Sequence, residues 1–255
     1  MEEALANLNL LNEEEEAFQE DVRTVDHVYS LCLVGCCLTD SVVHFPSLRN
    51  TLADLWHPIK GICISDLGGK RFLFQFFHEV DIQRVLLGTP WFFNIHLLLL
   101  HRIQPGENPL LVPLNLANCW VQIHDLPPGL MTVSMAEQFG NFLGQFLDYD
   151  MSFSSKGFHT FMHIKARLEV SKPLKRKKKI LILTDRVIYA RFQHEKLSLF
   201  CFICGKLGHG ESFCPFRTSI EPSKIGFGRD ITLWAATRRQ SVSASKWLQD
   251  ADGSD

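Results

Sequence analysis

Three cysteines and one histidine stand close together near residue 200, at spacings typical of metal ligands. Two residues separate Cys201 from Cys204, four more precede His209, and another four precede Cys214. Three thiolates and one imidazole form the tetrahedral sulfur and nitrogen set that zinc prefers in structural sites. These side chains fill all four positions, which leaves none for an activated water. The sequence therefore predicts one structural Zn²⁺ ion and argues against a catalytic one.

The residues between the ligands favour a tight loop around one ion. Gly205 and Gly208 lie between Cys204 and His209, and glycine adopts backbone conformations that other residues avoid. The 14-residue segment from Cys201 to Cys214 is too short to build its own core. We therefore expect metal binding to supply its folding energy, on the order of 10 kcal/mol.

Charge is strongly segregated along the 255-residue chain, although the net charge is only −2. Residues 1–26 contain nine acidic residues and one basic residue, whereas residues 165–218 contain thirteen basic and four acidic residues. Such a basic segment is expected of a surface that binds a polyanion. Its densest part is a basic run made of Lys172, Lys175, Arg176, Lys177, Lys178 and Lys179. This run fits phosphate neutralisation, a nuclear-import signal, or a solvated connection between strands.

The elements that must position these residues begin with the order β-α-β-β-α-β. We expect a strand over 28–38, a helix from Pro46 to Pro58, a hairpin of 61–65 and 71–77, a helix over 81–87 and a strand over 91–101. This is the split βαβ order of ferredoxin-like domains, which many RNA-recognition domains also use. The order alone does not indicate a function.

A second α+β segment precedes the metal ligands. It has an expected helix over 133–147 and expected strands over 120–124, 159–170, 179–183 and 187–194. We therefore predict an α+β protein, in which a ferredoxin-like or RNA-recognition-like domain precedes an α+β extension and a small zinc module. The expected parts are an acidic disordered arm (1–26), the βαββαβ domain (27–104), the extension with its basic strands (105–198), the zinc module (199–217) and a polar disordered tail (218–255).

Two further patterns favour burial over chemistry. Phe72, Phe74 and Phe76 alternate on one face of an expected strand, but Leu73 and Phe77 make the other face apolar as well. Core packing is therefore favoured over base stacking. We also expect burial for the remaining cysteines, which lie in apolar runs without a histidine ligand nearby: Cys32, Cys36, Cys37, Cys63 and Cys119.

Several classes of protein are disfavoured by motifs and composition. We find no phosphate-binding loop, zinc-protease motif or nucleophile elbow, so we expect no enzyme and no small-molecule substrate. No apolar run reaches the roughly 18 to 20 residues of a membrane helix, and the acidic N-terminus is unlike a signal peptide. We expect a soluble intracellular protein, in the nucleus or cytoplasm, and the basic run slightly favours the nucleus.

The run CFICGKLGHGESFC resembles the zinc knuckle of retroviral nucleocapsid proteins and, more closely, that of plant LINE-type retrotransposon proteins. Further blocks in the same order resemble that plant family: FLFQFF, GTPWFFN, LLLLHRIQPGENP, WVQIHDLPPGLM, FGNFLGQFLDYD and KPLKRKKK. Members carry an N-terminal domain of unknown function followed by one CCHC knuckle. The resemblance covers about residues 28–215. It implies a retroelement-derived nucleic-acid-binding protein, or a domesticated or truncated copy of one.

Together, the residues and the resemblance indicate non-enzymatic, zinc-dependent binding of single-stranded RNA or DNA with low sequence specificity. Phe202 offers a stacking face, but Gly210 and Glu211 stand where retroviral knuckles supply apolar residues, so we expect weak stacking. The expected phosphate contacts are Lys165, Arg167, Lys172, Lys175, Arg176, Lys177, Lys178, Lys179, Arg186, Arg191 and Lys206. The alternative is a protein-interaction or self-association module, in which zinc holds a structural knob and the acidic arm docks onto the basic segment.

Overall fold

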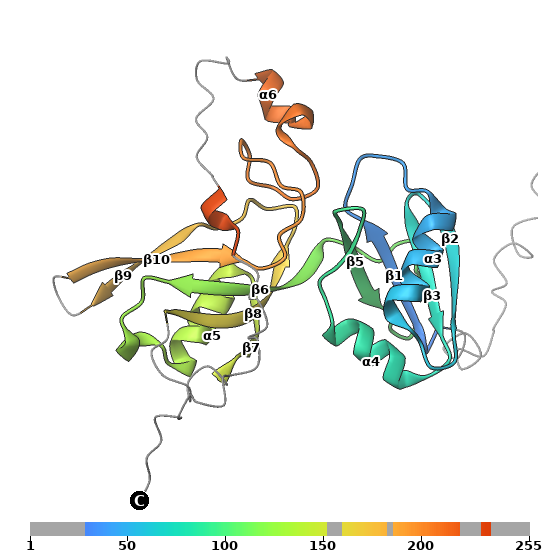
Figure 1. Cartoon of the computed structure of the whole chain (residues 1–255), viewed down its shortest axis with the longest axis horizontal. Coiled ribbons are helices and arrows are strands. Elements are labelled where there is room, and N and C mark those ends of the chain that lie inside the picture. Colours follow the sequence, from blue (N-terminus) through green and yellow to red (C-terminus); the bar gives the residue numbers. More distant parts are fainter. Residues whose placement is uncertain (1–28, 152–159, 183–185, 220–230, 236–255) are drawn as a thin grey trace, which may run out of the picture. The chain divides into compact units, whose positions relative to one another are not determined.

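The computed structural model describes residues 29–151, 160–182, 186–219 and 231–235 (Figure 1). The predicted acidic arm and most of the predicted tail lie outside these residues. Two compact units are present. Among the described residues, the first unit runs up to Gly35 and includes 45–86 and 100–113, while the second includes 36–44, 87–99 and the chain from Leu114 onward. No helix in the described ranges is long and apolar enough to cross a membrane.

The first sheet, sheet A, has the split βαβ arrangement expected from the sequence. Its strands are β1 (Cys32–Cys37), β2 (Ile62–Gly68), β3 (Arg71–Phe76), β4 (Trp91–Phe93) and β5 (His96–Arg102). Helix α3 (Phe45–Trp56) follows β1, and α4 (Glu79–Leu87) follows β3. The strand order is β2-β3-β1-β5-β4, so β3 lies between β1 and β2.

The phenylalanines of β3 belong to the core beside α3. Phe72, Phe74 and Phe76 are each at most 2% exposed. The ring of Trp56, at the end of α3, lies 5.2 Å from the Phe74 ring and 5.9 Å from the Phe76 ring. The prediction of core packing is confirmed, and this face of β3 is not available for base stacking.

The single strand expected over 91–101 is wrong, because the chain turns within it. Asn94 and Ile95 both have positive φ angles, 45° and 65°. They form a two-residue turn, and Trp91 then pairs with Leu98 in an antiparallel hairpin. Two positive φ angles give the turn twist that joins antiparallel strands, and asparagine tolerates that conformation well.

The second sheet, sheet B, carries the basic strands. It contains β6 (Leu116–His124), β7 (Gln145–Tyr149), β8 (Phe161–Glu169), β9 (Lys177–Ile182) and β10 (Arg186–His194), in the order β7-β8-β6-β10-β9. Helix α5 (Val133–Leu143) covers one face of this sheet (Figure 1). On that face the ring of Phe139 lies 5.8 Å from the ring of Phe192, and both side chains are buried. Pairing across sheet B is antiparallel throughout.

Helix α5 ends earlier than the sequence pattern suggested. The expected helix over 133–147 stops at Leu143, and Phe146 belongs to strand β7. A Cβ atom on Gly144 would overlap the carbonyl oxygen of Arg167 in β8. Because only glycine permits so close an approach, the chain leaves the helix here and pairs with β8 at once.

Part of the predicted disordered tail is packed against sheet B. The short helix η5 (Ile231–Leu233) ends with Leu233 only 1% exposed, and Ala235 is equally buried. The N–H of Ala235 donates a hydrogen bond to the carbonyl of His194 at 3.0 Å. The prediction of a disordered tail is therefore wrong for residues 231–235, where the side chains of Leu233 and Ala235 are buried.

Candidate zinc centre and basic surface

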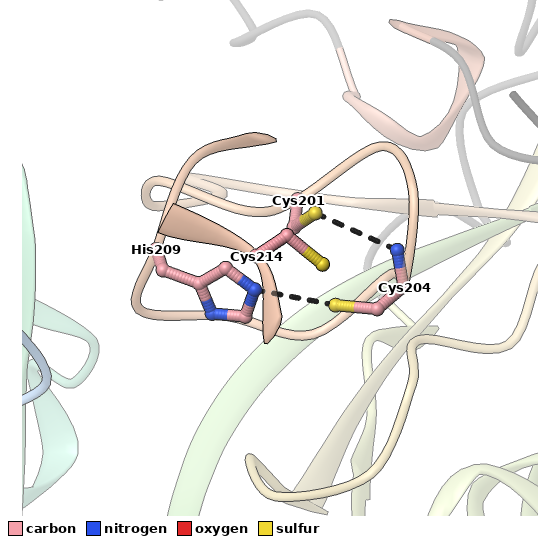
Figure 2. Close-up of side chains that lie close together, drawn as sticks. All are labelled: Cys201, Cys204, His209 and Cys214. Atoms are coloured by element: carbon pink, nitrogen blue, oxygen red, sulfur yellow. Dashed lines mark hydrogen bonds between the residues drawn. The ribbon is translucent and has the colours of Figure 1, made fainter. Parts of the chain in front are cut away.

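The four ligand residues predicted from the sequence come together in one cluster (Figure 2). Their ligand atoms, three Sγ atoms and one imidazole nitrogen, all lie within 4.8 Å of one another. Cys204 Sγ is 3.3 Å from His209 Nε2, and the N–H of Cys204 donates to Cys201 Sγ at 3.5 Å. Cys201 and Cys214 are buried, while Cys204 and His209 are half-buried. The side chains thus converge on a single point from both sides of the loop.

Backbone hydrogen bonds hold the loop in shape around that point. The N–H of Gly205 donates to the carbonyl of Cys201 at 2.7 Å, and the N–H of Cys201 donates to the carbonyl of Lys206 at 2.9 Å. Gly205 and Gly208 have φ angles of 72° and 95°. Glycine is the residue that adopts this left-handed conformation without strain, so both glycines have the role expected of them.

The cluster fits a structural zinc ion. Around tetrahedral Zn²⁺, bond lengths of about 2.3 Å to sulfur and about 2.0 Å to nitrogen separate ligand atoms by roughly 3.5 to 3.8 Å. Cys204 Sγ and His209 Nε2 are 3.3 Å apart and no pair of ligand atoms exceeds 4.8 Å, so small side-chain shifts would bring all four into this range. In the protein without metal, burial raises the pKa of the Cys201 thiol to about 11. A buried thiolate therefore needs a cation beside it, and four protein ligands leave no open position for catalysis.

Residues 199–217, which we call the zinc loop, share an apolar core with sheet B. The sequence did not indicate this packing. Phe200 and Leu207, on either side of Cys201 and Cys204, are buried in the same apolar cluster as Val121 and Ile164 of the sheet. The N–H of Leu174, which lies within the basic run between Lys172 and Lys175, donates to the carbonyl of Gly205 at 2.8 Å. Apolar burial therefore contributes to the stability of this loop together with the metal.

Phe202 is less available for stacking than its position suggested. It is half-buried, and its ring lies 4.5 Å from that of Phe200. Its backbone N–H donates to Glu211 Oε1 at 3.2 Å, so the Glu211 carboxylate supports the loop.

Two exposed aromatic residues on the zinc loop had not been singled out in the sequence. Phe213 is 77% exposed, and Phe216, in helix α6 (Pro215–Ser219), is 48% exposed. Lys206 Nζ lies 6.0 Å from the centre of the Phe216 ring. The only sequence signal for them was their position beside the last cysteine.

The basic run is divided between the two faces of sheet B. In the register of β9 and β10, Lys177 pairs with Arg191 and Lys179 pairs with Tyr189, whereas Lys178 pairs with the buried Ala190. Adjacent residues of a strand project to opposite faces. Lys178 therefore lies on the side of α5, where its Nζ is 4.3 Å from the centre of the Phe142 ring. Lys175 Nζ lies 4.2 Å from the centre of the same ring.

Several predicted phosphate contacts already have partners within the protein. Lys172 forms an ion pair with Glu169, and Arg191 forms one with Asp125. Arg167 donates to Asn118 Oδ1 at 3.2 Å. Hydrogen bonding to Arg191 lowers the pKa of the Asp125 carboxyl, which keeps that pair charged. Lys172 and Arg191 therefore offer less positive charge to a ligand than the sequence count implied, whereas Arg167 keeps its charge but has part of its guanidinium already bonded.

Other predicted contacts are more open. Lys177, Lys178, Lys179 and Arg186 are exposed, and none forms an ion pair with another described residue. Arg176 is exposed as well, while Lys165 is half-buried and donates to the carbonyl of Leu87 at 3.2 Å. The available positive charge of sheet B is therefore concentrated on β9.

The remaining cysteines are mostly buried, as predicted. Burial raises the pKa of Cys32 to about 11 and the pKa values of Cys37 and Cys119 to about 12. Cys36 is half-buried. Cys63 is the exception: it is exposed, because β2 is at the edge of sheet A and Cys63 lies on its outer face.

Comparison with known families agrees with this organisation. A domain of unknown function, DUF4283, matches residues 26–111, and a zinc knuckle family matches residues 168–216. The chain carries a DUF4283 domain followed by a CCHC zinc knuckle. The knuckle match begins within β8, so it includes β9, β10 and the basic run in addition to the four ligands.

The chain is also similar to an uncharacterized protein of Arabidopsis thaliana, At4g02000. The two are 26% identical over 144 residues, which are 56% of this chain and 45% of the relative. The match thus spans less than half the length of that relative.

Proposed function

We propose that this protein binds single-stranded RNA or DNA through its zinc knuckle and the basic surface of sheet B, with little sequence specificity and without catalysis. The observation that carries the proposal is the hydrogen bond from the Leu174 N–H to the Gly205 carbonyl. It ties the zinc loop to the residue that directly precedes Lys175. The zinc loop and the basic run therefore lie next to each other, where lysines would contact phosphates and aromatic rings would contact unpaired bases.

The resemblance to plant LINE-type retrotransposon proteins supports a retroelement origin as part of this proposal. A polynucleotide ligand also fits the proposed location in the nucleus or cytoplasm.

Salt dependence of binding tests the electrostatic part of the proposal. We expect the affinity for short single strands to fall steeply with salt, because each neutralised phosphate adds about 0.7 to the slope of log affinity against log salt. Replacing Lys177, Lys178 and Lys179 together should reduce the magnitude of that slope by about 1.4 to 2, according to whether two or all three of them contact phosphates. Lys60→Gln, which removes an exposed charge just before β2, is the control and should leave it unchanged. Affinity that does not respond to salt would refute the proposal.

A second candidate function, a protein-interaction module with a structural zinc clip, is favoured by the partial burial of Phe202. The variant Phe202→Leu keeps the apolar volume and removes the aromatic face. If the knuckle stacks on bases, we expect binding to weaken by about 1 kcal/mol, the low end of the usual range, with zinc still bound. Unchanged binding, together with protein partners that survive nuclease treatment of an extract, would support the clip instead.

A further inference from the structure

One face of the β9–β10 hairpin lies opposite the face that packs against α5, and it carries both cations and aromatic rings. We call it the open face, and it comprises Lys177, Lys179, Tyr189 and Arg191, continued by His124 and Phe161. Directly paired residues of antiparallel strands project from the same face. Lys177, Arg191, His124 and Phe161 are paired in turn across β9, β10, β6 and β8, so they form one row.

The opposite face of the same hairpin is closed by α5. Phe192 of β10 packs against Phe139 and Phe142 of that helix, with ring centres 5.8 and 5.9 Å apart. Lys175 and Lys178 lie against the Phe142 ring on this side. The basic run thus presents two lysines on each side of one sheet edge, and only one side also exposes aromatic residues of the sheet.

The open face has the chemistry that an unpaired polynucleotide requires. Tyr189 is 48% exposed, and Lys177 Nζ lies 4.9 Å from the centre of its ring. Lys179 is paired directly with Tyr189, so two lysines of β9 lie beside this aromatic residue on the same face of the sheet. Further along, the rings of His124 and Phe161 are 5.0 Å apart and half-buried. Stacked bases need an exposed aromatic ring, and the phosphates that flank them need nearby cations.

We propose that a single-stranded polynucleotide lies across the open face, with one base stacked on Tyr189 and the adjoining phosphates held by Lys177 and Lys179. This inference rests on the proposed function and assigns it to one surface. Arg191 contributes little charge because Asp125 neutralises it. The open face fits a polynucleotide because every nucleotide carries a phosphate beside a base, and here two lysines lie beside an exposed aromatic ring.

Charge removal on matched faces tests the assignment. The open-face pair Lys177→Gln/Lys179→Gln and the closed-face pair Lys175→Gln/Lys178→Gln each remove two charges from the same run. Binding of labelled oligo(U) and oligo(dT) to the full zinc-loaded chain is measured by fluorescence anisotropy over a salt series. We expect the open-face pair to reduce the salt slope by about 1.4 for single strands, and the closed-face pair to change it much less. Equal effects of the two pairs would overturn the assignment.

Replacement of Tyr189 tests the stacking contact separately. Tyr189→Leu should weaken binding about 5- to 100-fold with an unchanged salt slope, and Tyr189→Phe should retain binding. Val187→Ala is the control, because Val187 is 41% exposed on the same face but is not aromatic. Zinc content and near-ultraviolet circular dichroism report whether each variant is folded. If Tyr189→Leu binds as tightly as the wild type, the stacking assignment is wrong.

Photo-crosslinking supplies a readout that needs no variant. Oligonucleotides containing 5-iodouracil should crosslink to Tyr189, and crosslinks confined to the zinc loop would contradict the inference. The two kinds of strand separate RNA from DNA, because only RNA offers a 2′-hydroxyl. If the wild-type chain binds neither strand, the proposed function itself fails. If it binds with a salt slope that both lysine pairs reduce equally, the proposed function stands and the open face is rejected.

Discussion

The four ligand side chains of the zinc loop differ in their surroundings. Cys201 and Cys214 are at most 3% exposed, whereas Cys204 and His209 are half-buried. Because the first two are buried, they contribute to packing as well as offering ligand atoms. The second two contribute chiefly to coordination, and they are the better positions at which to remove the metal without damaging the core.

We expect Cys204→Ser to lose stoichiometric zinc. Amide hydrogen exchange should then become faster at Leu174, Gly205 and Gly208, whose N–H groups donate within or onto the loop. Amides of β2 and β3 should keep their protection, because they belong to a different sheet. Cys63→Ser removes an exposed thiol far from the cluster in sequence and should retain one zinc per chain. Elemental analysis showing one zinc in Cys204→Ser would contradict the ligand assignment.

Buried His194 makes the stability of sheet B sensitive to acid. It is 1% exposed, and burial lowers its pKa from 6.5 to about 4. Between about pH 6.5 and pH 4, His194 is therefore protonated in the unfolded chain but stays neutral in the folded chain. The stability that this residue provides is fully present above pH 6.5 and is lost as the pH falls toward 4, by about 3 kcal/mol in total.

We expect His194→Gln to lose less stability than the wild type between pH 7 and pH 5, by about 2 kcal/mol. Urea unfolding at the two pH values measures this difference, and zinc release, which affects both proteins, cancels in the comparison. His163 acts with the opposite sign: although burial opposes it, Glu195 and Asp150 raise its pKa. Parallel pH profiles of the two proteins would show that His194 is not the sensitive group.

The junction of α5 and β7 shows how one glycine determines an element boundary. The apolar spacing of Phe139, Phe142 and Phe146 is helical, so the sequence pattern continued the helix too far. The helix ends where Gly144 lies directly against β8. This is a tertiary contact, so the apolar periodicity of the sequence does not reveal it. Strands β1 and β3 were predicted correctly, because each is a mostly apolar segment that can be recognised from its own residues.

We expect Gly144→Ala to destabilise the protein by about 2 kcal/mol or more, because the new methyl group must displace β8 or the turn. Gly129→Ala is the matched control, since a Cβ atom there would meet nothing within 4 Å. It should change the free energy of unfolding by less than about 0.5 kcal/mol. Chemical unfolding of both variants at constant zinc measures the two effects, and equal losses would mean that the close contact is easily relaxed.

Considered as a whole, the molecule has a zinc site that is local in sequence and a basic surface that is not. All four ligand residues lie within 14 positions, so residue type and spacing were sufficient to find them. Tyr189 and its two flanking lysines become neighbours only through the register of β9 and β10. A sequence pattern does not specify register, which explains why the lysines were recognised as a group while their division between two faces was missed.

The shared core also predicts how firmly the metal is held. Phe200 and Leu207 are buried with residues of sheet B. Zinc can therefore leave the full chain only when the packing of these two side chains against the sheet loosens. We expect a chelator to remove zinc more slowly from the full chain than from a peptide of residues 199–217. Stopped-flow measurement with a chromogenic chelator checks this, and equal rates would mean that the loop behaves as an independent unit.

Strand β9 is the last strand in the order of sheet B, so among the described strands its outer edge has no neighbour. Its second half, Ile180 to Ile182, is the kind of apolar strand that recruits other chains, and its first half is three consecutive lysines. Lysines on an edge strand discourage such pairing by mutual repulsion. A bound polyanion cancels that repulsion, so neighbouring molecules on the same strand of nucleic acid would lose the charge that keeps their β9 edges apart. If the proposed function holds, binding of nucleic acid and association of neighbouring chains would be linked through the same three side chains.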